Sequence, residues 1–206
     1  MQFSLKYYKS TILVPVILVL ALIFDSFIST LINCFPNIEI IRAPSNSALI
    51  ALFLGIHNQY LWHLPIFNKL VNIPDMRGRY SGKIKSNWNG ENKIKDCKIE
   101  ISQTASSISI RSYFNNEEGE KTSSKSLIEQ IKEEDGFYQL YFFYLNTGTL
   151  ENSSLDCHEG ANSFKFIPST KDKKAKLIGN YFTNRQVQTK GIIEVEFESK
   201  KLRGEF

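Results

Sequence analysis

Three side chains that can bind an anionic ligand stand at every second position near the C-terminal end of the chain: Tyr181, Thr183 and Arg185. Alternate residues of a β-strand share a face, so a strand here would align a phenol, a hydroxyl and a guanidinium. Arginine can hold a phosphate through two parallel hydrogen bonds, and a tyrosine ring can stack on a base or a sugar. The same row begins with core-like residues, Leu177 and Gly179. The row is therefore either the polar floor of a ligand pocket or a strand face that leaves the core for solvent.

The segments around this row predict an all-β domain from residue 74 to residue 206. Alternating runs of β-branched and aromatic residues are separated by turn-forming clusters such as "NNEEGE" and "PSTKDKK". About eight sequential antiparallel strands predict an up-and-down β-barrel, whose interior holds side chains or one small ligand. The fourth strand is the weakest, because its "LIEQIKEE" segment could form a short helix. The expected strands are 78–88, 94–104, 106–115, 122–131, 136–146, 155–167, 175–184 and 190–199.

Alternation along these strands assigns the inner and outer faces of the barrel. In the first strand, glycines and apolar residues alternate with a row that begins at Arg79, so we expect that basic row to face solvent. Strand 136–146 is apolar on both faces, which indicates that it is buried twice or faces a partner. The inner positions of the first two strands provide further candidate ligand-binding residues. These are Tyr80, Trp88 and Gln103.

No catalytic or metal-binding pattern accompanies these residues. The phosphate-binding patterns G-x-x-x-x-G-K-[ST] and G-x-G-x-x-G are absent from the sequence, as are G-x-S-x-G and H-E-x-x-H. His158 beside Glu159 is more typical of a loop hydrogen bond than of a catalytic base. Three cysteines without a C-x-x-C spacing predict neither a disulfide framework nor a zinc site. We therefore expect a binding protein without enzyme activity, metal or cofactor.

The charge distribution argues against a general binder of DNA or RNA. The formal net charge is +4, and the all-β domain carries 21 basic and 19 acidic residues. Non-specific binding of nucleic acid needs a clear basic excess. The near balance remains compatible with a small anionic ligand that a few groups hold.

Residues 1–73 have a different composition and predict a transmembrane hairpin. Residues 12–35 are almost wholly apolar and long enough to cross a hydrocarbon core of about 30 Å. A second apolar run, at residues 47–66, reaches that length only with its polar C-terminal part. Basic residues flank both ends of the hairpin, so we expect the N-terminus and the C-terminal domain to be cytoplasmic. No A-x-A-like site follows the first segment, so we expect no cleaved signal peptide.

Four polar residues within the expected hairpin are candidates for function. A charged or polar side chain inside a bilayer is costly unless it meets a partner or water. The group after residue 56 is either an interfacial helix end or a hydrogen-bonding surface for self-association. The candidates for a membrane or oligomerisation role are Asp25, His57, Asn58 and Gln59.

The order of these features resembles a known family. Two membrane segments followed by "IPDMRGRYSG", "HEG" and "LIGNYFTNRQ…KG" are similar to the CD-NTase-associated membrane effectors of cyclic-oligonucleotide-based antiphage signalling systems (CBASS). The resemblance covers nearly the whole chain in layout and rests on short motifs. Tyr80 stands where that family often has Trp. The residues that carry the resemblance are Pro74, Gly78, Tyr80, Gly82, His158, Gly160, Leu177, Gly179, Tyr181, Thr183, Arg185 and Gly191.

The resemblance implies a function. In that family a partner CD-NTase makes a cyclic dinucleotide on phage infection. The β-barrel binds it, the protein oligomerises, and the bacterial inner membrane is disrupted, which leads to abortive infection. The resemblance implies a multi-pass inner-membrane protein in contact with lipids, with Arg185 on a phosphate and Tyr181 and Thr183 on a base or sugar. The residues alone leave an alternative open: a membrane-anchored structural or assembly protein whose barrel binds protein or lipid without nucleotide sensing.

Overall fold

The chain forms two compact units, which we describe separately. One consists of residues 1–73 and 104–107, and the other of residues 74–103 and 108–206. The computed structural model describes residues 3–34, 45–88, 91–115, 121–146, 148 and 157–206.

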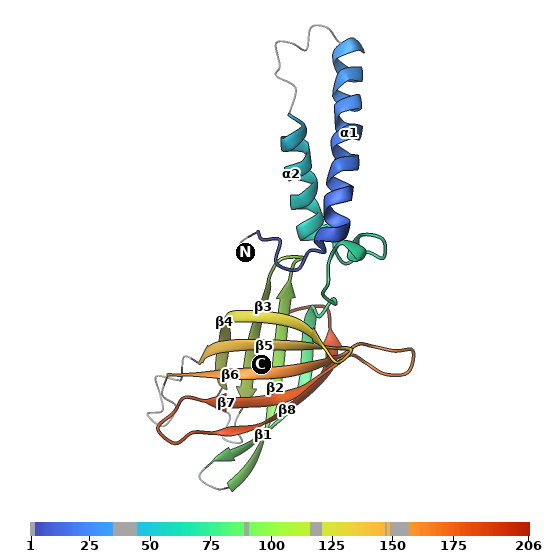
Figure 1. Cartoon of the computed structure of the whole chain (residues 1–206). Helices are drawn as coiled ribbons and strands as arrows, with labels where there is room; N and C mark the ends of the chain where they lie inside the picture. Colours follow the sequence, from blue (N-terminus) through green and yellow to red (C-terminus); the bar gives the residue numbers. More distant parts are fainter. Residues whose placement is uncertain (1–2, 35–44, 89–90, 116–120, 147, 149–156) are drawn as a thin grey trace. The chain divides into compact units, whose positions relative to one another are not determined.

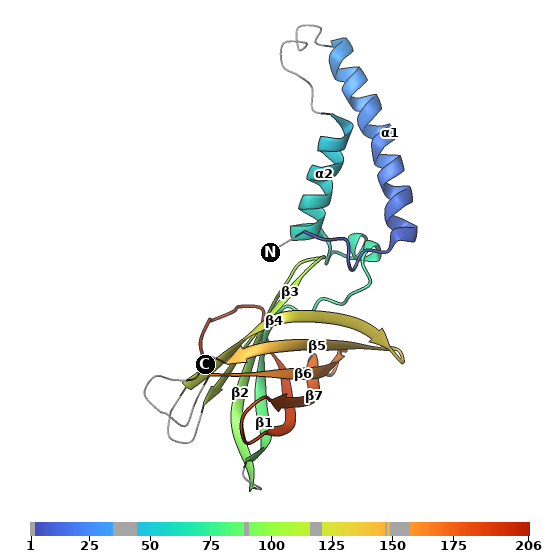
Figure 2. The same cartoon turned by 60° about the vertical axis from the view of Figure 1, so that its left-hand side comes forward.

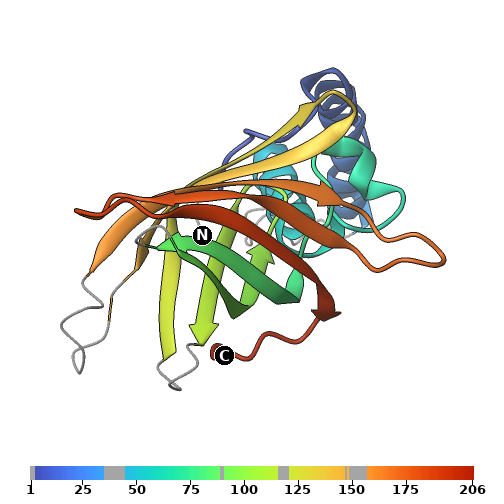
Figure 3. The ribbon, with the colours of Figure 1, turned by 90° about the horizontal axis from the view of Figure 1, so that it is seen from below.

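The second unit is a closed antiparallel β-barrel of eight strands (Figure 1). Each strand pairs with the next along the chain, and β8 pairs with β1 to close the sheet (Figure 3). Closure pairs both sides of every described strand, which removes the sheet edges through which β-proteins associate. The expected eight-stranded up-and-down barrel is thus confirmed. The strands are β1 Gly78–Trp88, β2 Glu91–Gln103, β3 Ile108–Asn115, β4 Lys121–Glu134, β5 Phe137–Asn146, β6 His158–Ile167, β7 Lys176–Thr183 and β8 Lys190–Ser199.

The strand boundaries lie close to those expected from the sequence. Segment "LIEQIKEE", which could have been helical, belongs to β4. The register of β4 against β5 shifts between Ser126 and Ile128, so Leu127 is an extra residue of the kind found in a β-bulge. The expected turns "NWNGEN", "NNEEGE" and "NTGTLENSS" lie wholly or partly outside the described residues.

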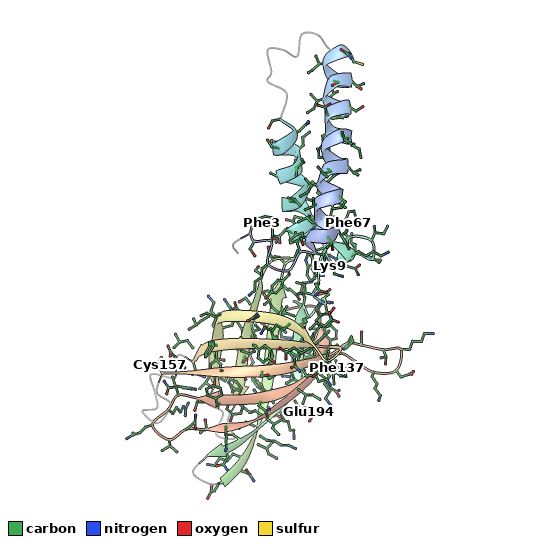
Figure 4. The ribbon with its side chains drawn as sticks, viewed as in Figure 1. Phe3, Lys9, Phe67, Phe137, Cys157 and Glu194 are labelled. Carbon is green, nitrogen blue, oxygen red and sulfur yellow. The ribbon has the colours of Figure 1, made fainter. Side chains whose placement is uncertain are left out.

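The interior of the barrel is apolar at one end. Inner positions there are filled by aliphatic and aromatic side chains, each of which stabilises the fold by about 1.5–3 kcal/mol when fully buried. Figure 4 labels Phe137 at this apolar end and Cys157 at the opposite, polar end. The completely buried inner residues of the apolar end include Ile101, Leu140, Phe164, Leu177 and Val195.

One residue of the outer face departs from the sequence expectation. Arg79, expected in solvent, is completely buried, because residues near the C-terminus cover it. Its Nη1 donates to Glu100 Oε1 at 2.7 Å and to the carbonyl oxygen of Glu205 at 2.6 Å. The backbone N–H of Arg203 donates to the same Glu100 oxygen at 2.7 Å. Alternation along one strand cannot reveal this burial, because the covering residues are distant in sequence.

The first unit contains one long helix and one short helix, which lie side by side in Figures 1 and 2. Helix α1 (Ser10–Cys34) has 25 residues and a mean hydropathy of 2.6, which suits a membrane span. Helix α2 (Asn46–Ile56) has 11 residues. Its N-cap is Ser45, whose Oγ accepts a hydrogen bond from the N–H of Ala48 at 3.3 Å.

The second membrane span expected at residues 47–66 is not present as a continuous α-helix. Helix α2 ends at Ile56, and a π-helical turn (His57–Leu61) and a 3-10 turn (Phe67–Leu70) follow. Eleven helical residues extend about 16 Å, roughly half of a hydrocarbon core. The expected hairpin of two spans is therefore wrong in this respect, and within the described residues α1 is the one helix long and apolar enough to cross a membrane.

Candidate functional site

The polar end of the barrel gathers buried hydrogen-bonding side chains from neighbouring strands. Asn146 of β5 is directly opposite His158 of β6, and Asn162 of β6 is directly opposite Tyr181 of β7. Each buried member of this group is at most 9% exposed. We define the polar inner cluster as Tyr144, Asn146, His158, Asn162, Tyr181 and Thr183, together with the half-buried Arg185.

Arg185 lies in the β7–β8 loop and contacts β6. Its Nη2 is 3.0 Å from His158 Nδ1 and 3.4 Å from His158 Nε2, so the guanidinium lies beside both ring nitrogens. The ring of Tyr144 packs edge-on against the imidazole, with 6.3 Å between the ring centroids. The guanidinium is thus held at the polar end by His158 of β6, whose ring packs against Tyr144 of β5.

The loop that carries Arg185 is closed by hydrogen bonds between Thr183 and Thr189. Their hydroxyl oxygens are 2.8 Å apart, and the N–H of Thr183 donates to the carbonyl of Thr189 at 2.9 Å. The N–H of Asn184 donates to the carbonyl of Glu159 at 2.8 Å, which ties the loop to β6. Thr183 therefore positions Arg185 through its own bonds within the protein.

Two phenols line the same interior. Burial raises the pKa of Tyr144 and of Tyr181 above the usual value, so both remain protonated donors at neutral pH. Glycines in the wall give the rings space. A Cβ at Gly160 would collide with Tyr144 Oη, and one at Gly191 would lie 2.8 Å from Tyr181 Cε1.

Asn162 provides a buried acceptor that lacks a partner. The residue is 8% exposed, and its Oδ1 makes no hydrogen bond with any described residue. An unsatisfied buried amide costs about 1–3 kcal/mol. Such a group calls for an explanation in a native protein, and completion by a ligand is one. The position of Asn162 between Phe142 and Tyr181 in the strand register places this acceptor among aromatic rings.

The structure brings together half of the ligand-binding residues expected from the sequence. Tyr181, Thr183 and Arg185 belong to the polar inner cluster. Trp88 is the last residue of β1, at the same end, but its side chain lies outside the described part of the chain.

The other two expected residues lie at the apolar end. Tyr80 Oη donates to the carbonyl of Met76 at 2.9 Å. Gln103 accepts from the N–H of Met76 and donates to the carbonyl of Pro74, both at 2.9 Å. These bonds fix the segment that enters β1, so Tyr80 and Gln103 do not contact the polar inner cluster.

Sequence reasoning did not assign four members of the cluster to the ligand site, although His158 is one of the residues that carry the family resemblance. These members are Tyr144, Asn146, His158 and Asn162. The signal for Tyr144 was its place on the same face of strand 136–146 as the buried Leu140. His158 precedes Gly160 by two residues, which places both on one face of β6. Their convergence depends on strand register, which the alternation of one strand does not provide.

The histidine expected to act in the membrane stabilises the first unit. His57 is completely buried. Its Nδ1 is 3.0 Å from Tyr8 Oη, and its Nε2 is 3.1 Å from the carbonyl oxygen of Phe67. These contacts join the segments before α1 and after α2.

The remaining three membrane candidates differ in their surroundings. Asn58 Oδ1 accepts from Ser106 Oγ at 2.5 Å, whereas Gln59 is exposed. Asp25 lies on the exposed surface of α1 and accepts from Asn46 of α2 at 3.4 Å. A role for these groups in self-association stays a prediction.

A concave region lies at the apolar end of the barrel. It encloses about 550 Å³ and has a rim of exposed lysines, mainly from the β6–β7 loop, residues 168–175. Asp75 in this region receives two hydrogen bonds from Arg77 at 2.9 Å and one from Lys200 at 3.2 Å. Burial raises the pKa of Asp75, but these cations outweigh burial and lower it to about 2. We call this region the basic hollow.

The barrel and its polar inner cluster define a class of protein: a β-barrel receptor for a small polar ligand. The sequence model of the family described as "Cap15, cyclic dinucleotide receptor domain" matches residues 71–196, which include the whole polar inner cluster. CD-NTase-associated protein 15 of Escherichia albertii is 30% identical over 155 residues, which cover 72% of this chain and 76% of that protein. The chain therefore belongs to the Cap15 cyclic dinucleotide receptor family of CBASS, which confirms the family expected from the sequence.

Proposed function

We propose that this chain is an antiphage effector that senses a cyclic dinucleotide through its polar inner cluster. The observation that carries this proposal is the arrangement of Arg185 beside His158, two buried phenols and the unpartnered oxygen of Asn162. Membership of a cyclic dinucleotide receptor family identifies the class of ligand that this arrangement would bind.

Each group of the cluster has a distinct task in this proposal. Arg185 binds a phosphate oxygen by charge-assisted hydrogen bonds. Tyr144 and Tyr181 donate hydrogen bonds or stack on the base or sugar faces. Asn162 Oδ1 accepts from a base N–H, so ligand binding would satisfy a buried group that the free protein leaves unsatisfied. The selectivity for particular bases would come from that contact.

The effector step takes place at a membrane. Helix α1 has the length and hydropathy of a membrane anchor, and the barrel would lie in the cytoplasm, where a CD-NTase releases its product. Ligand binding would then cause homo-oligomerisation and disruption of the inner membrane, and the infected cell would die. An alkaline phosphatase fused after Phe206 should be inactive in cells, because that enzyme needs the periplasm. An active fusion would contradict the cytoplasmic location of the barrel.

Thermal unfolding of the full chain in detergent tests the ligand class. A panel of cyclic dinucleotides should include at least one that raises the unfolding temperature, whereas the matching linear dinucleotides should not. A ligand at 100 times its Kd stabilises the folded state by about 2.7 kcal/mol. Stabilisation by phosphatidylglycerol micelles alone would instead support a membrane-anchored assembly protein, and no shift with any cyclic dinucleotide would contradict the proposed function.

A further inference from the structure

A row of buried polar side chains crosses the inner wall of the barrel near its polar end. Ser112 of β3 is directly opposite Ser124 of β4, and Ser124 is directly opposite Asn146 of β5. Asn146 is in turn directly opposite His158 of β6. Ser112 is 3% exposed, Ser124 6% and Asn146 5%. We call Ser112, Ser124 and Asn146 the inner row, which extends the polar inner cluster from His158 on to β4 and β3.

The two hydroxyl groups of the inner row are available to a ligand. Among the described residues, neither Ser112 nor Ser124 has a hydrogen-bond partner for its side chain. Asn146 Oδ1 accepts from the N–H of Gly148 at 2.9 Å, which leaves the amide NH2 group of Asn146 as a donor. Buried polar groups are normally hydrogen-bonded, so two neighbouring serines without partners call for an explanation.

Another serine of β4 shows that the fold can use such a hydroxyl. Ser126 is two residues further along the strand than Ser124, on the same inner face, and is 5% exposed. Its Oγ accepts from the N–H of Ile110 at 2.9 Å and donates to the carboxylate of Glu129. The fold therefore requires the hydroxyl of Ser126, whereas it makes no use of the hydroxyl of Ser124.

The inner row lies close to the polar end of the barrel. Phe114 and Thr122 are directly opposite each other, two residues nearer that end than Ser112 and Ser124, on the same inner face. Both are only half-buried, so solvent reaches the inner wall just beyond the inner row. An aromatic ring at this position can stack on a nucleobase.

We propose that the inner row binds the second base of the cyclic dinucleotide, while Asn162 and Tyr181 bind the first. The inference rests on the proposed function, because it divides the same ligand between two base sites. Serine hydroxyls donate and accept, and the amide group of Asn146 donates. A base edge presents both donors and acceptors, so the inner row can pair with it without a charged group.

The spacing of the two base sites suits a ligand with its phosphates between them. Ser124 is two strands away from His158, about 10 Å at the usual strand separation. Asn162 is four residues from His158 along β6, about 13 Å. Arg185, whose Nη2 is 3.0 Å from His158 Nδ1, therefore lies between the two sites. Phosphates join the two nucleosides of a cyclic dinucleotide, so a guanidinium between two base sites is placed to bind one of them.

Titration of the full chain in detergent, with a cyclic dinucleotide that binds the wild type, tests the inner row. Ser112→Ala with Ser124→Ala should weaken binding about tenfold, because hydrogen bonds to the ligand are lost, and should not lower the unfolding temperature. Ser126→Ala is the matched control. It should bind within about threefold of the wild type and unfold a few degrees lower, because its hydroxyl is bonded within the protein.

Combination with Asn162→Leu tests whether the two sites bind different bases. Independent contacts contribute additively to the binding free energy, so the combined variant should bind about a hundredfold more weakly than the wild type. The serine double variant should also change the ratio of affinities for two cyclic dinucleotides that differ in one base, by about fivefold. Ser126→Ala should leave that ratio unchanged.

The outcomes separate this inference from the proposed function. Wild-type affinity and base preference in the serine double variant, while Arg185→Ala loses binding, would overturn the inference and leave the proposed function standing. An equal loss of affinity in Ser126→Ala, or no further loss on adding Asn162→Leu, would also overturn it. A wild type that binds no cyclic dinucleotide would instead refute the proposed function.

Discussion

The two ends of the barrel differ in whether a buried polar side chain is left without a hydrogen-bond partner. At the apolar end, Tyr80 and Gln103 form hydrogen bonds with the backbone of Pro74 and Met76. At the polar end, Asn162 keeps an unpartnered oxygen. Paired polar groups at one end fix the entry of the chain into β1, whereas the group without a partner at the other end remains available to a ligand.

This difference teaches how to separate structural from functional polar residues in a small barrel. Tyr80 and Tyr181 are both buried tyrosines on inner positions, and sequence alone gave them the same expected role. Their surroundings distinguish them. Tyr80 donates to the backbone carbonyl of Met76, whereas Tyr181 makes side-chain hydrogen bonds with Ser86 and Thr189 and lies across from the unpartnered Asn162. The two ends should therefore respond differently to substitution, the apolar end through stability and the polar end through binding.

The largest expected effect comes from opening a cavity at the apolar end. Phe164 is completely buried and packs edge-on against Phe142, with 5.5 Å between ring centroids. Phe164→Ala should lower the free energy of unfolding by about 3–5 kcal/mol. Guanidinium denaturation of the full chain in detergent, followed by circular dichroism, measures this change. Phe137→Ala, at a position 45% exposed, is the control and should cost less than about 1 kcal/mol. An equal decrease in unfolding free energy in the two variants would contradict the assignment of Phe164 to the barrel core.

A smaller effect is expected from Asn162→Leu at the polar end, where stability and ligand affinity should change in opposite directions. Removing the unpartnered amide should leave the unfolding free energy unchanged or raise it by about 1 kcal/mol. The same change should weaken ligand binding roughly tenfold, because a hydrogen bond of about 1.4 kcal/mol is lost. Denaturation of the variant measures its unfolding free energy, and ligand titration of the same preparation measures its affinity. A variant that is clearly less stable would show that Asn162 is a structural residue like Gln103.

The smallest effect concerns acid stability at the basic hollow. The folded-state pKa of Asp75 is about 2, below its usual value of 3.8, so ionised Asp75 stabilises the fold above pH 3.8. That stabilisation, about 1 kcal/mol for a partly exposed group, should be lost as the pH falls from about 4 to about 2. Asp75→Asn should be less stable than the wild type at pH 6 and equally stable at pH 2. Asp172→Asn, in the same hollow, is the control. An unchanged pH profile in Asp75→Asn would exclude this ion network as a source of stability.

Local patterns predicted the barrel well, because strand identity depends on alternation within ten residues. The same patterns failed where distant residues decide the outcome. Arg79 is buried by residues near the C-terminus, and the second membrane helix stops at Ile56. His57 forms hydrogen bonds with Tyr8 and Phe67, which both lie outside α2.

The candidate site was predictable only in part for a related reason. The row of Tyr181, Thr183 and Arg185 lies in one stretch of chain and could be identified from its types and spacing. Its partners come from β5 and β6, and their convergence depends on register between strands. Tyr80 and Gln103 were placed with this row because inward direction can be predicted from alternation, whereas the end of the barrel cannot.

Direct titration of a cyclic dinucleotide into the full chain, with one substitution at each end of the barrel, tests the central claim. The account predicts that Arg185→Ala weakens binding by about 2–3 kcal/mol, roughly a hundredfold, because a charge-assisted phosphate contact is lost. Its unfolding should change by less than about 1 kcal/mol. Lys200→Ala, which removes a cation from the basic hollow, should bind within about threefold of the wild type. Normal binding by a folded Arg185→Ala protein together with loss of binding in Lys200→Ala would place the ligand in the basic hollow and contradict the account.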